Sequence, residues 1–229
     1  MAVKLTVSVG ADGKNTISAE IMAIQTLLNK WVEPKIGVTG ICSGKSDDPT
    51  VIAIKSFQSK FSSSPDGRID PGGTSLKYLN REPFILLPQV SGFGYYSYGK
   101  GSWNDRQWGT QATIDALKDI ARQFNWNNPT AQIGIGDISL QFGQHMSPHD
   151  SHRSGMNVDI RPCRTDDAMI PVAFTDTGYD QAKTKLLIEL CLSHKNVKNI
   201  LFNDPEIYKL DRVSFHEGHH DHFHITMIG

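Results

Sequence analysis

The sequence predicts an α+β protein built from a small N-terminal helical domain and a larger C-terminal domain. In the first part of the chain, apolar residues recur at helical spacing between turns rich in glycine, proline and serine. The second part mixes long amphipathic helices with short apolar strands and has no glycine-rich phosphate loop. We therefore expect a three-helix domain over residues 1–81, a linker over 82–95, and an α+β domain with a central antiparallel sheet over 96–229.

The N-terminal domain begins with a strand pattern and continues with three helices. The alternation of Val3, Leu5, Val7 and Val9 with polar or small residues is typical of a strand. Ser18 is a candidate cap for the first helix. Asp47-Asp48-Pro49 starts the second helix, since proline suits the first turn. The apolar positions of the three helices are Ile21, Ile24, Leu27, Leu28 and Trp31, then Val51, Ile54, Phe57 and Phe61, then Leu76 and Leu79.

Two long helices and four strands are predicted in the C-terminal domain. The first helix covers 110–125, with Thr110 as a candidate cap, and the second covers 179–194. The predicted strands cover 132–140, 156–160, 199–202 and 223–228.

The composition excludes several classes of function. A formal net charge of −1 gives no basic surplus for non-specific nucleic-acid binding. No apolar run approaches the length of a membrane span, and the N-terminus lacks the apolar core of a secretory signal. We therefore expect the chain to be made without a signal peptide and to stay in a cytosol unless another machinery exports it. Three widely spaced cysteines, Cys42, Cys163 and Cys191, form neither a disulfide framework nor a zinc knuckle.

Eight of the nine histidines fall into two short segments, three in residues 143–162 and five in 215–226. In the first segment, His152 and Asp159 form the pattern H-x6-D. Asp159 lies within the apolar strand "MNVDI", where a carboxylate is costly unless it is paired or binds a metal. Gly155 between them lets the chain turn so that both side chains converge.

The second segment offers matching ligands on the terminal strand. His222 and His224 are alternate residues, so they can face one site while Phe223 faces the core. His219 precedes them in an H-x-x-H-x-H pattern. Zinc is typically held by three such protein ligands in a catalytic site. The other histidines are more often ordinary surface or core residues, and these are His145, His149, His194, His216 and His220.

The segments "SHRSGMNVDI" (151–160) and "HHDHFHI" (219–225) resemble a superfamily of zinc peptidases. It includes lysostaphin-type enzymes, D-Ala-D-Ala metallopeptidases and hedgehog-type domains, and the chain is most similar to penicillin-insensitive murein endopeptidases. "IGDISLQFG" (135–143) and "WGTQATIDALKDIA" (108–121) also match. Met156-Asn157 departs from the usual Leu-Asp, and the disulfide cysteines of some periplasmic members are not evident.

This resemblance implies a role for each matching residue. His152, Asp159 and His224 would bind Zn²⁺, His222 would be catalytic, and His219 would be a further active-site histidine. The segment with Asp137 and Ser139 would line the site. His149 lies in the same histidine segment as His152, and we expect it to line the cleft for the substrate and not to bind the metal. Glu217 is a second candidate for the catalytic base, because other zinc peptidases use a glutamate.

The first domain resembles the peptidoglycan-binding-like module. The matching segments are "IQTLLN" (24–29), "AIKSFQSKF" (53–61) and "DGRIDPGGTSLKYLN" (66–80). The resemblance implies anchoring to the cell wall, and a purely structural role is the alternative. A tether of this kind raises the effective concentration of an enzyme at an insoluble polymer.

Together the two resemblances imply a zinc-dependent murein endopeptidase that cleaves the D-Ala to meso-diaminopimelate cross-link of peptidoglycan. The alternatives are a D,D-carboxypeptidase or amidase on the same scaffold, and a non-catalytic zinc-containing protein that binds the cell wall. Without a signal sequence, we expect delivery to the periplasm as an antibacterial effector of a secretion system or as a phage lysin released through a holin. The expected partners are peptidoglycan and an immunity protein or secretion-system component, with a monomeric chain.

Overall fold

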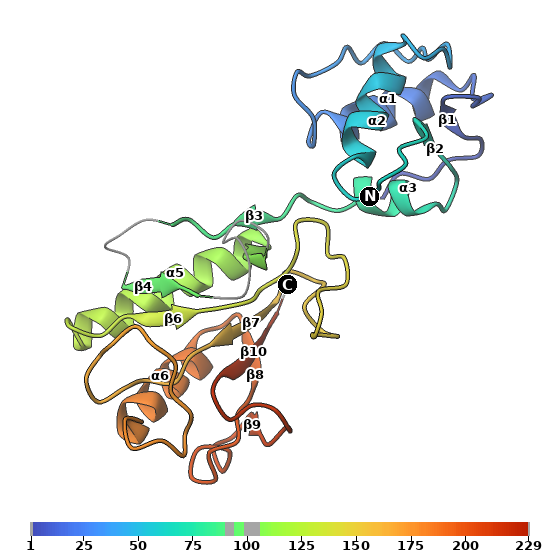
Figure 1. The fold of residues 1–229 in the computed structure, drawn as a ribbon. Coiled ribbons are helices and arrows are strands. Elements are labelled where there is room, and N and C mark those ends of the chain that lie inside the picture. Colours follow the sequence, from blue (N-terminus) through green and yellow to red (C-terminus); the bar gives the residue numbers. More distant parts are fainter. Residues whose placement is uncertain (1, 90–93, 99–105, 229) are drawn as a thin grey trace. The chain divides into compact units, whose positions relative to one another are not determined.

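The computed structural model describes residues 2–89, 94–98 and 106–228, and the chain separates into two compact units, Met1–Pro83 and Phe84–Gly229 (Figure 1). The described residues form five helices, three in the first unit and two in the second. Each of these helices is too short or too polar to cross a bilayer. Residues 90–93 of the predicted linker lie outside the described part, whereas Ile85–Leu86 of that linker form strand β3 within the second unit.

The first unit packs helices α1 (Ser18–Leu28), α2 (Pro49–Gln58) and α3 (Thr74–Leu79) beside the short antiparallel pair β1 (Val9–Gly10) and β2 (Arg68–Ile69). The helices share an apolar core because their buried residues recur at helical spacing. That core contains Ile21, Ile24, Leu28, Val51, Ile54, Phe57, Leu76 and Leu79.

Two local predictions for this unit are wrong. Ser18 is the first residue of α1 and not its cap; Ile17 occupies the cap position without a side-chain hydrogen bond. Of the strand predicted over residues 3–9, only Val9 lies in a strand. The backbone N–H and carbonyl of Val3 bond instead to the side chain of Asn80, and Val7 is exposed, so the alternation does not mark a strand.

The second unit is built on a six-stranded mixed sheet, in the order β4-β6-β7-β10-β8-β9. The strands are β4 (Tyr95–Ser97), β6 (Ile133–Ile135), β7 (Asn157–Ile160), β10 (Phe223–Met227), β8 (Val197–Leu201) and β9 (Val213–Ser214). The four inner strands pair antiparallel, but β4 and β9 pair parallel to their neighbours. The expected antiparallel sheet is therefore corrected to a mixed one.

Helices α5 (Gln111–Asn127) and α6 (Gln181–Ser193) pack on the same core as the inner strands (Figure 1). Thr110 caps α5 as predicted, since its hydroxyl accepts a hydrogen bond from the Thr113 N–H at 3.1 Å. The strand residues that contact the helices include Val158, Ile160, Phe223 and Ile225. Since side chains alternate along a strand, Asp159 and His224 emerge on the opposite face of the sheet.

Candidate metal centre

The site begins with two directly opposed residues on neighbouring central strands. Asp159 of β7 and His224 of β10 are partners in the antiparallel ladder, and the Asp159 Oδ1 to His224 Nδ1 distance is 2.9 Å. Both residues are buried, at 5 % exposure each. The strand register alone thus brings together two residues that are far apart in the sequence.

His152 reaches the same point from the loop before β7. Its Nε2 lies 3.2 Å from both Asp159 Oδ1 and His224 Nδ1. Gly155 turns the loop with a φ of +68°, and its carbonyl accepts a hydrogen bond from the Thr110 N–H. A Cβ at this position would lie 3.0 Å from the Thr110 nitrogen, so the turn requires glycine as predicted.

A second hydrogen bond fixes the tautomer of each imidazole. His152 Nδ1 lies 3.0 Å from the Ile138 carbonyl, which can only accept, so Nδ1 carries a proton. His224 Nε2 lies 3.1 Å from Asn157 Oδ1. The Asn157 amide donates to the Ser151 carbonyl at 2.8 Å, which turns its oxygen toward His224. In the neutral form of each ring, the nitrogen that faces Asp159 is therefore the unprotonated one, which is the atom that a metal can bind.

The protonation states of Asp159 and His224 are those in which the two side chains can bind a metal. Burial alone would raise the pKa of Asp159, but hydrogen bonds to His152 and His224 hold it well below its ordinary value, so the carboxylate is ionised. Burial lowers the pKa of His224, which favours the neutral imidazole. An ionised carboxylate and a neutral imidazole are the forms that bind metals.

His149 lies at the edge of this group. Its Nδ1 is 3.8 Å from Asp159 Oδ2, and its ring centroid is 4.4 Å from that of His152. His149, His152 and Asp159 could together hold a metal ion. We predicted His149 as a substrate contact, and the structure places it close enough to Asp159 to be considered as a ligand as well.

Asp137 holds His149 from the other side. Its Oδ2 lies 3.0 Å from His149 Nε2 and 2.9 Å from the Arg106 guanidinium, and the hydrogen bond to Asp137 raises the pKa of His149. The Asp159 N–H donates to the Asp137 carbonyl, which fixes the two acids side by side. Ser139, also predicted to line the site, is fully buried and its hydroxyl donates to the Leu140 carbonyl, so it lies outside this group.

The two predicted catalytic histidines lie at the exposed side of the group. His222 Nε2 is 4.0 Å from Asp159 Oδ1, and its Nδ1 is 2.9 Å from the Asp221 carboxylate. The His219 ring centroid lies 4.8 Å from that of His222, and burial lowers the pKa of His219. Glu217, the second candidate for a base, is exposed on the preceding loop.

The sequence patterns missed three residues that orient this site: Arg106, Asn157 and Asp221. Asn157 and Asp221 each lie two residues or fewer from a predicted site residue, and a search for polar neighbours of those residues would have found them. Arg106 is distant in the sequence from the histidine segments. The sequence points to Arg106 only indirectly: Asp137 was predicted to line the site, and a buried carboxylate needs a cationic partner.

The chain matches no model of a known protein family, and a search of curated proteins finds no significant match.

Proposed function

We propose that His152, Asp159 and His224 hold a zinc ion and that the chain is a zinc-dependent peptidase that cleaves peptide cross-links in peptidoglycan. The observation that carries the proposal is the triangle formed by His152 Nε2, His224 Nδ1 and Asp159 Oδ1, with sides of 3.2, 3.2 and 2.9 Å. Three tetrahedral zinc ligands at about 2.0–2.1 Å from the metal lie roughly 3.3 Å apart.

The tautomers support a cation at the centre of the triangle. In the neutral form of both rings, each of the three atoms presents an electron pair to the others, because the protons of His152 and His224 are engaged by Ile138 and Asn157. Such atoms repel one another unless a proton or a metal cation lies between them. A hydrogen-bonded acceptor on the far nitrogen of each imidazole is also the usual support of a metal-binding histidine.

Two histidines and one carboxylate suit zinc, and they leave a coordination position open for catalysis. We prefer His224 to His149 as the third ligand. The His149 Nε2 atom is already bonded to Asp137, and its Nδ1 lies farther from the Asp159 carboxylate than either of the other nitrogens. When bound, zinc supplies Lewis acidity toward a peptide carbonyl.

Two histidines beside the metal ligands, His222 and His219, would carry out the proton transfers of the reaction. His222 Nε2 faces the metal ligands, and Asp221 holds its other nitrogen, so His222 is positioned to take up or release a proton at Nε2. His219 lies beside it and can donate to the oxyanion or the leaving amine. Glu217 is the alternative base, but its exposure on the loop makes it the weaker candidate.

Peptidoglycan as the substrate rests on the resemblances of the two units to murein endopeptidases and to the peptidoglycan-binding-like module. Among the possible bonds we favour the D-Ala to meso-diaminopimelate cross-link, a D,D-endopeptidase activity. A D,D-carboxypeptidase or amidase would use the same metal group with a different pocket, and a non-catalytic wall-binding protein would lack a functional His222. Delivery as an effector or a phage lysin stays a prediction, which neighbouring immunity or holin genes would distinguish.

The test combines metal analysis with product identification. Zinc-loaded protein is incubated with purified sacculi, and the soluble fragments are identified by mass spectrometry. We expect cross-linked dimers to disappear with the wild-type chain and to persist with His222→Ala, which should retain its zinc. Exposed His145→Ala serves as the matched control and should keep both zinc and activity. Intact dimers after digestion with zinc-loaded wild-type protein would reject the proposal.

A further inference from the structure

Arg161 lies on the same face of the sheet as the metal group. It follows Asp159 by two residues, and its backbone N–H donates to the Gly134 carbonyl at 3.0 Å, which extends the β6–β7 pairing beyond Ile160. Alternation along the strand therefore directs Asp159 and Arg161 to one side and Ile160 to the core. Two residues of strand separate their Cα atoms by about 7 Å.

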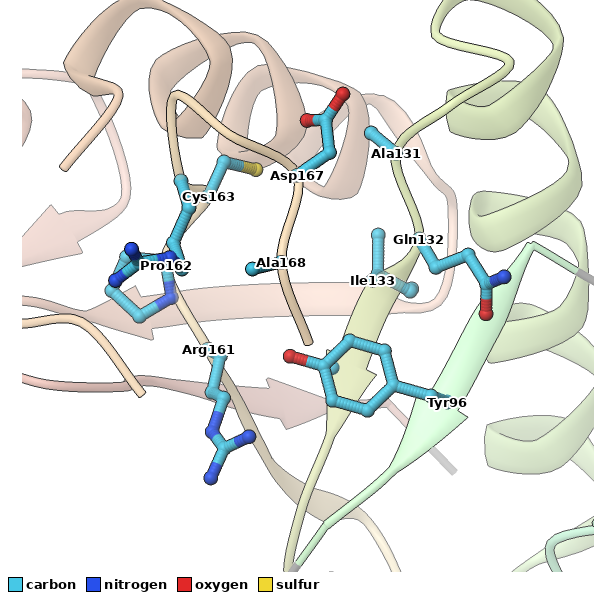
Figure 2. Close-up of a pocket in the computed structure, with 11 residues that line it drawn as sticks. Tyr96, Ala131, Gln132, Ile133, Arg161, Pro162, Cys163, Asp167 and Ala168 are labelled. Carbon is cyan, nitrogen blue, oxygen red and sulfur yellow. The ribbon is translucent and has the colours of Figure 1, made fainter. Parts of the chain in front are cut away.

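Two tyrosines from β4 and its end hold the Arg161 guanidinium in place. Its central carbon lies 3.9 Å from the Tyr98 ring centroid and 6.0 Å from that of Tyr96. Figure 2 shows Tyr96 and Arg161 on either side of β6, where they line a small pocket. Stacking of this kind is favourable for arginine and limits its motion.

Gly134 on β6 and Gly136 just after it make room for both rings. A Cβ at Gly134 would lie 2.7 Å from the Tyr96 hydroxyl oxygen, and a Cβ at Gly136 would lie 2.7 Å from the Tyr98 ring. Any larger residue at either position would displace the tyrosine from the strand. The sequence "GIG" before Asp137 thus has a structural purpose, which is to make room for the two aromatic rings beside Arg161.

The charge of Arg161 has no counter-ion among the described residues. Among those residues its side chain makes one hydrogen bond, from a terminal nitrogen to the Met169 carbonyl at a long 3.5 Å. By contrast, Arg106 and Arg164 each bond to a carboxylate at 2.9 Å or less. Arginine carries five N–H donors in a planar fork, so most of its donors remain available to a ligand.

A buried polar atom beside Arg161 also lacks a partner. The Tyr98 hydroxyl is enclosed and makes no hydrogen bond within the described residues. Burial raises the pKa of Tyr98 well above its ordinary value, so this hydroxyl keeps its proton and can donate. A ligand bound at Arg161 would offer it an acceptor.

We propose that Arg161 forms a carboxylate-binding subsite of the active site, which receives the free carboxylate on the leaving side of the scissile bond. This inference rests on the proposed function. In a D-Ala to meso-diaminopimelate link, the released nitrogen is bonded to a carbon that bears a carboxylate. The distance of about 7 Å between Asp159 and Arg161 suits a group in the residue next to the scissile bond, because consecutive Cα atoms are about 3.8 Å apart.

A planar, stacked guanidinium matches a carboxylate through two parallel hydrogen bonds, and the stack removes much of the entropy cost of ordering the side chain. The subsite would therefore select cross-links whose leaving amine carries a neighbouring carboxylate. It would disfavour links in which that carboxylate is amidated. It would also disfavour bonds to a simple alkyl amine, such as a lysine side chain.

The test measures binding separately from cleavage. Calorimetric titration compares two probes on the zinc-loaded full chain: a meso-diaminopimelate tripeptide, and its analogue with a carboxamide in place of the carboxylate beside the free amine. We expect the wild-type chain to bind the carboxylate form roughly tenfold or more tightly. Arg161→Gln should bind both probes equally, and Arg161→Lys should show a reduced preference because it keeps the charge and loses the fork.

Arg122→Gln is the matched control, because it removes the same charge from the surface of α5, where Arg122 pairs with Asp119. It should keep the wild-type preference. Equal binding of both probes by the wild-type chain, or a preference that survives in folded Arg161→Gln, would overturn the inference. Sacculus digestion with the same preparations tests the proposed function independently: selective binding without cleavage would reject that function alone, and cleavage without selectivity would reject the subsite alone.

Discussion

Asp159 Oδ1 and His224 Nδ1 lie 2.9 Å apart because the two residues are directly paired across β7 and β10. An antiparallel ladder is rigid, and both residues are buried. The distance between these atoms is therefore set by the strand register and does not depend on a flexible loop. A metal site on such a scaffold is preorganised, and this makes the consequences of single substitutions specific.

Asp159→Asn should abolish tight zinc binding while the protein stays folded. The amide keeps the shape of the side chain but removes the negative charge that balances the metal. We expect at least a hundredfold loss of zinc affinity, by order of magnitude from the contribution of a direct ligand. Competition with a chromogenic chelator measures the affinity, and circular dichroism checks the fold. Zinc affinity within a few-fold of wild type would show that Asp159 is not a ligand.

Asn157→Ala should weaken zinc binding without removing a ligand. Asn157 Oδ1 accepts the proton of His224 Nε2, and its loss frees the imidazole to rotate or to change tautomer. Loss of such an orienting contact typically reduces metal affinity by about 10–100-fold. Asn199→Ala on the neighbouring strand β8 is the control and should bind zinc normally. An unchanged affinity in Asn157→Ala would mean that the backbone alone orients His224.

The predictable part of the site is the part that follows strand periodicity. Alternation along "MNVDI" and "FHITM" correctly separates Asp159 and His224 from their core-facing neighbours. The place of Asp137 and Ser139 beside the site was implied by the resemblance and not by periodicity. The strand predicted over 132–140 ends at Ile135 in β6, and the backbone of Ser139 bonds to Arg106 and Trp108 instead.

The fold was predictable to a similar extent. Long helices with strong amphipathic patterns, such as α5 with its Thr110 cap, were found close to their true bounds. The strands β4 and β9 have three and two residues, which is too few for a periodic pattern, so their parallel pairing at the sheet edges could not be read from the sequence. Contacts such as Arg106 with Asp137 depend on the tertiary fold and leave no local trace.

Gln25→Leu should destabilise the first unit strongly. Its side-chain oxygen accepts hydrogen bonds from the N–H groups of Thr39 and Gly40, and its amide donates to the Ile41 carbonyl and the Thr50 hydroxyl. Leucine fills the same space but leaves these groups without partners, at a cost of about 1–3 kcal/mol for each one that stays buried.

We expect the free energy of unfolding of this unit to fall by about 2–4 kcal/mol, measured by urea denaturation followed through tryptophan fluorescence. Thr26→Ala is the control: Thr26 is exposed on the same helix and bonds only within it, to the Met22 carbonyl, so its loss should cost less than about 1 kcal/mol. A stability equal to wild type for Gln25→Leu would show that the 39–41 loop is not tied to the helices by Gln25.

Asp167→Asn should lower stability at neutral pH and have little effect at acidic pH. The Lys183 ammonium lies 2.6 Å from Asp167 Oδ1, and the Thr130 hydroxyl donates to Oδ2 at 2.7 Å. These two bonds lower the pKa of Asp167 below its ordinary value of 3.8, and the bond from Lys183 has the larger effect. A lowered pKa stabilises the folded state above the ordinary value, and this contribution fades as the pH falls through the folded-state pKa.

The free energy of unfolding of Asp167→Asn should therefore be about 1 kcal/mol below that of wild type at pH 7, and the two should converge below pH 3.8. Asparagine tolerates the positive φ of +54° at this position, so the comparison isolates the charge. Asp119→Asn on the surface of α5 is the control. Its pair with Arg122 is exposed on both sides, so screening by solvent should make its effect smaller at every pH. A difference between Asp167→Asn and wild type that stays constant from pH 7 to pH 3 would show that the stabilisation does not come from the ionised carboxylate.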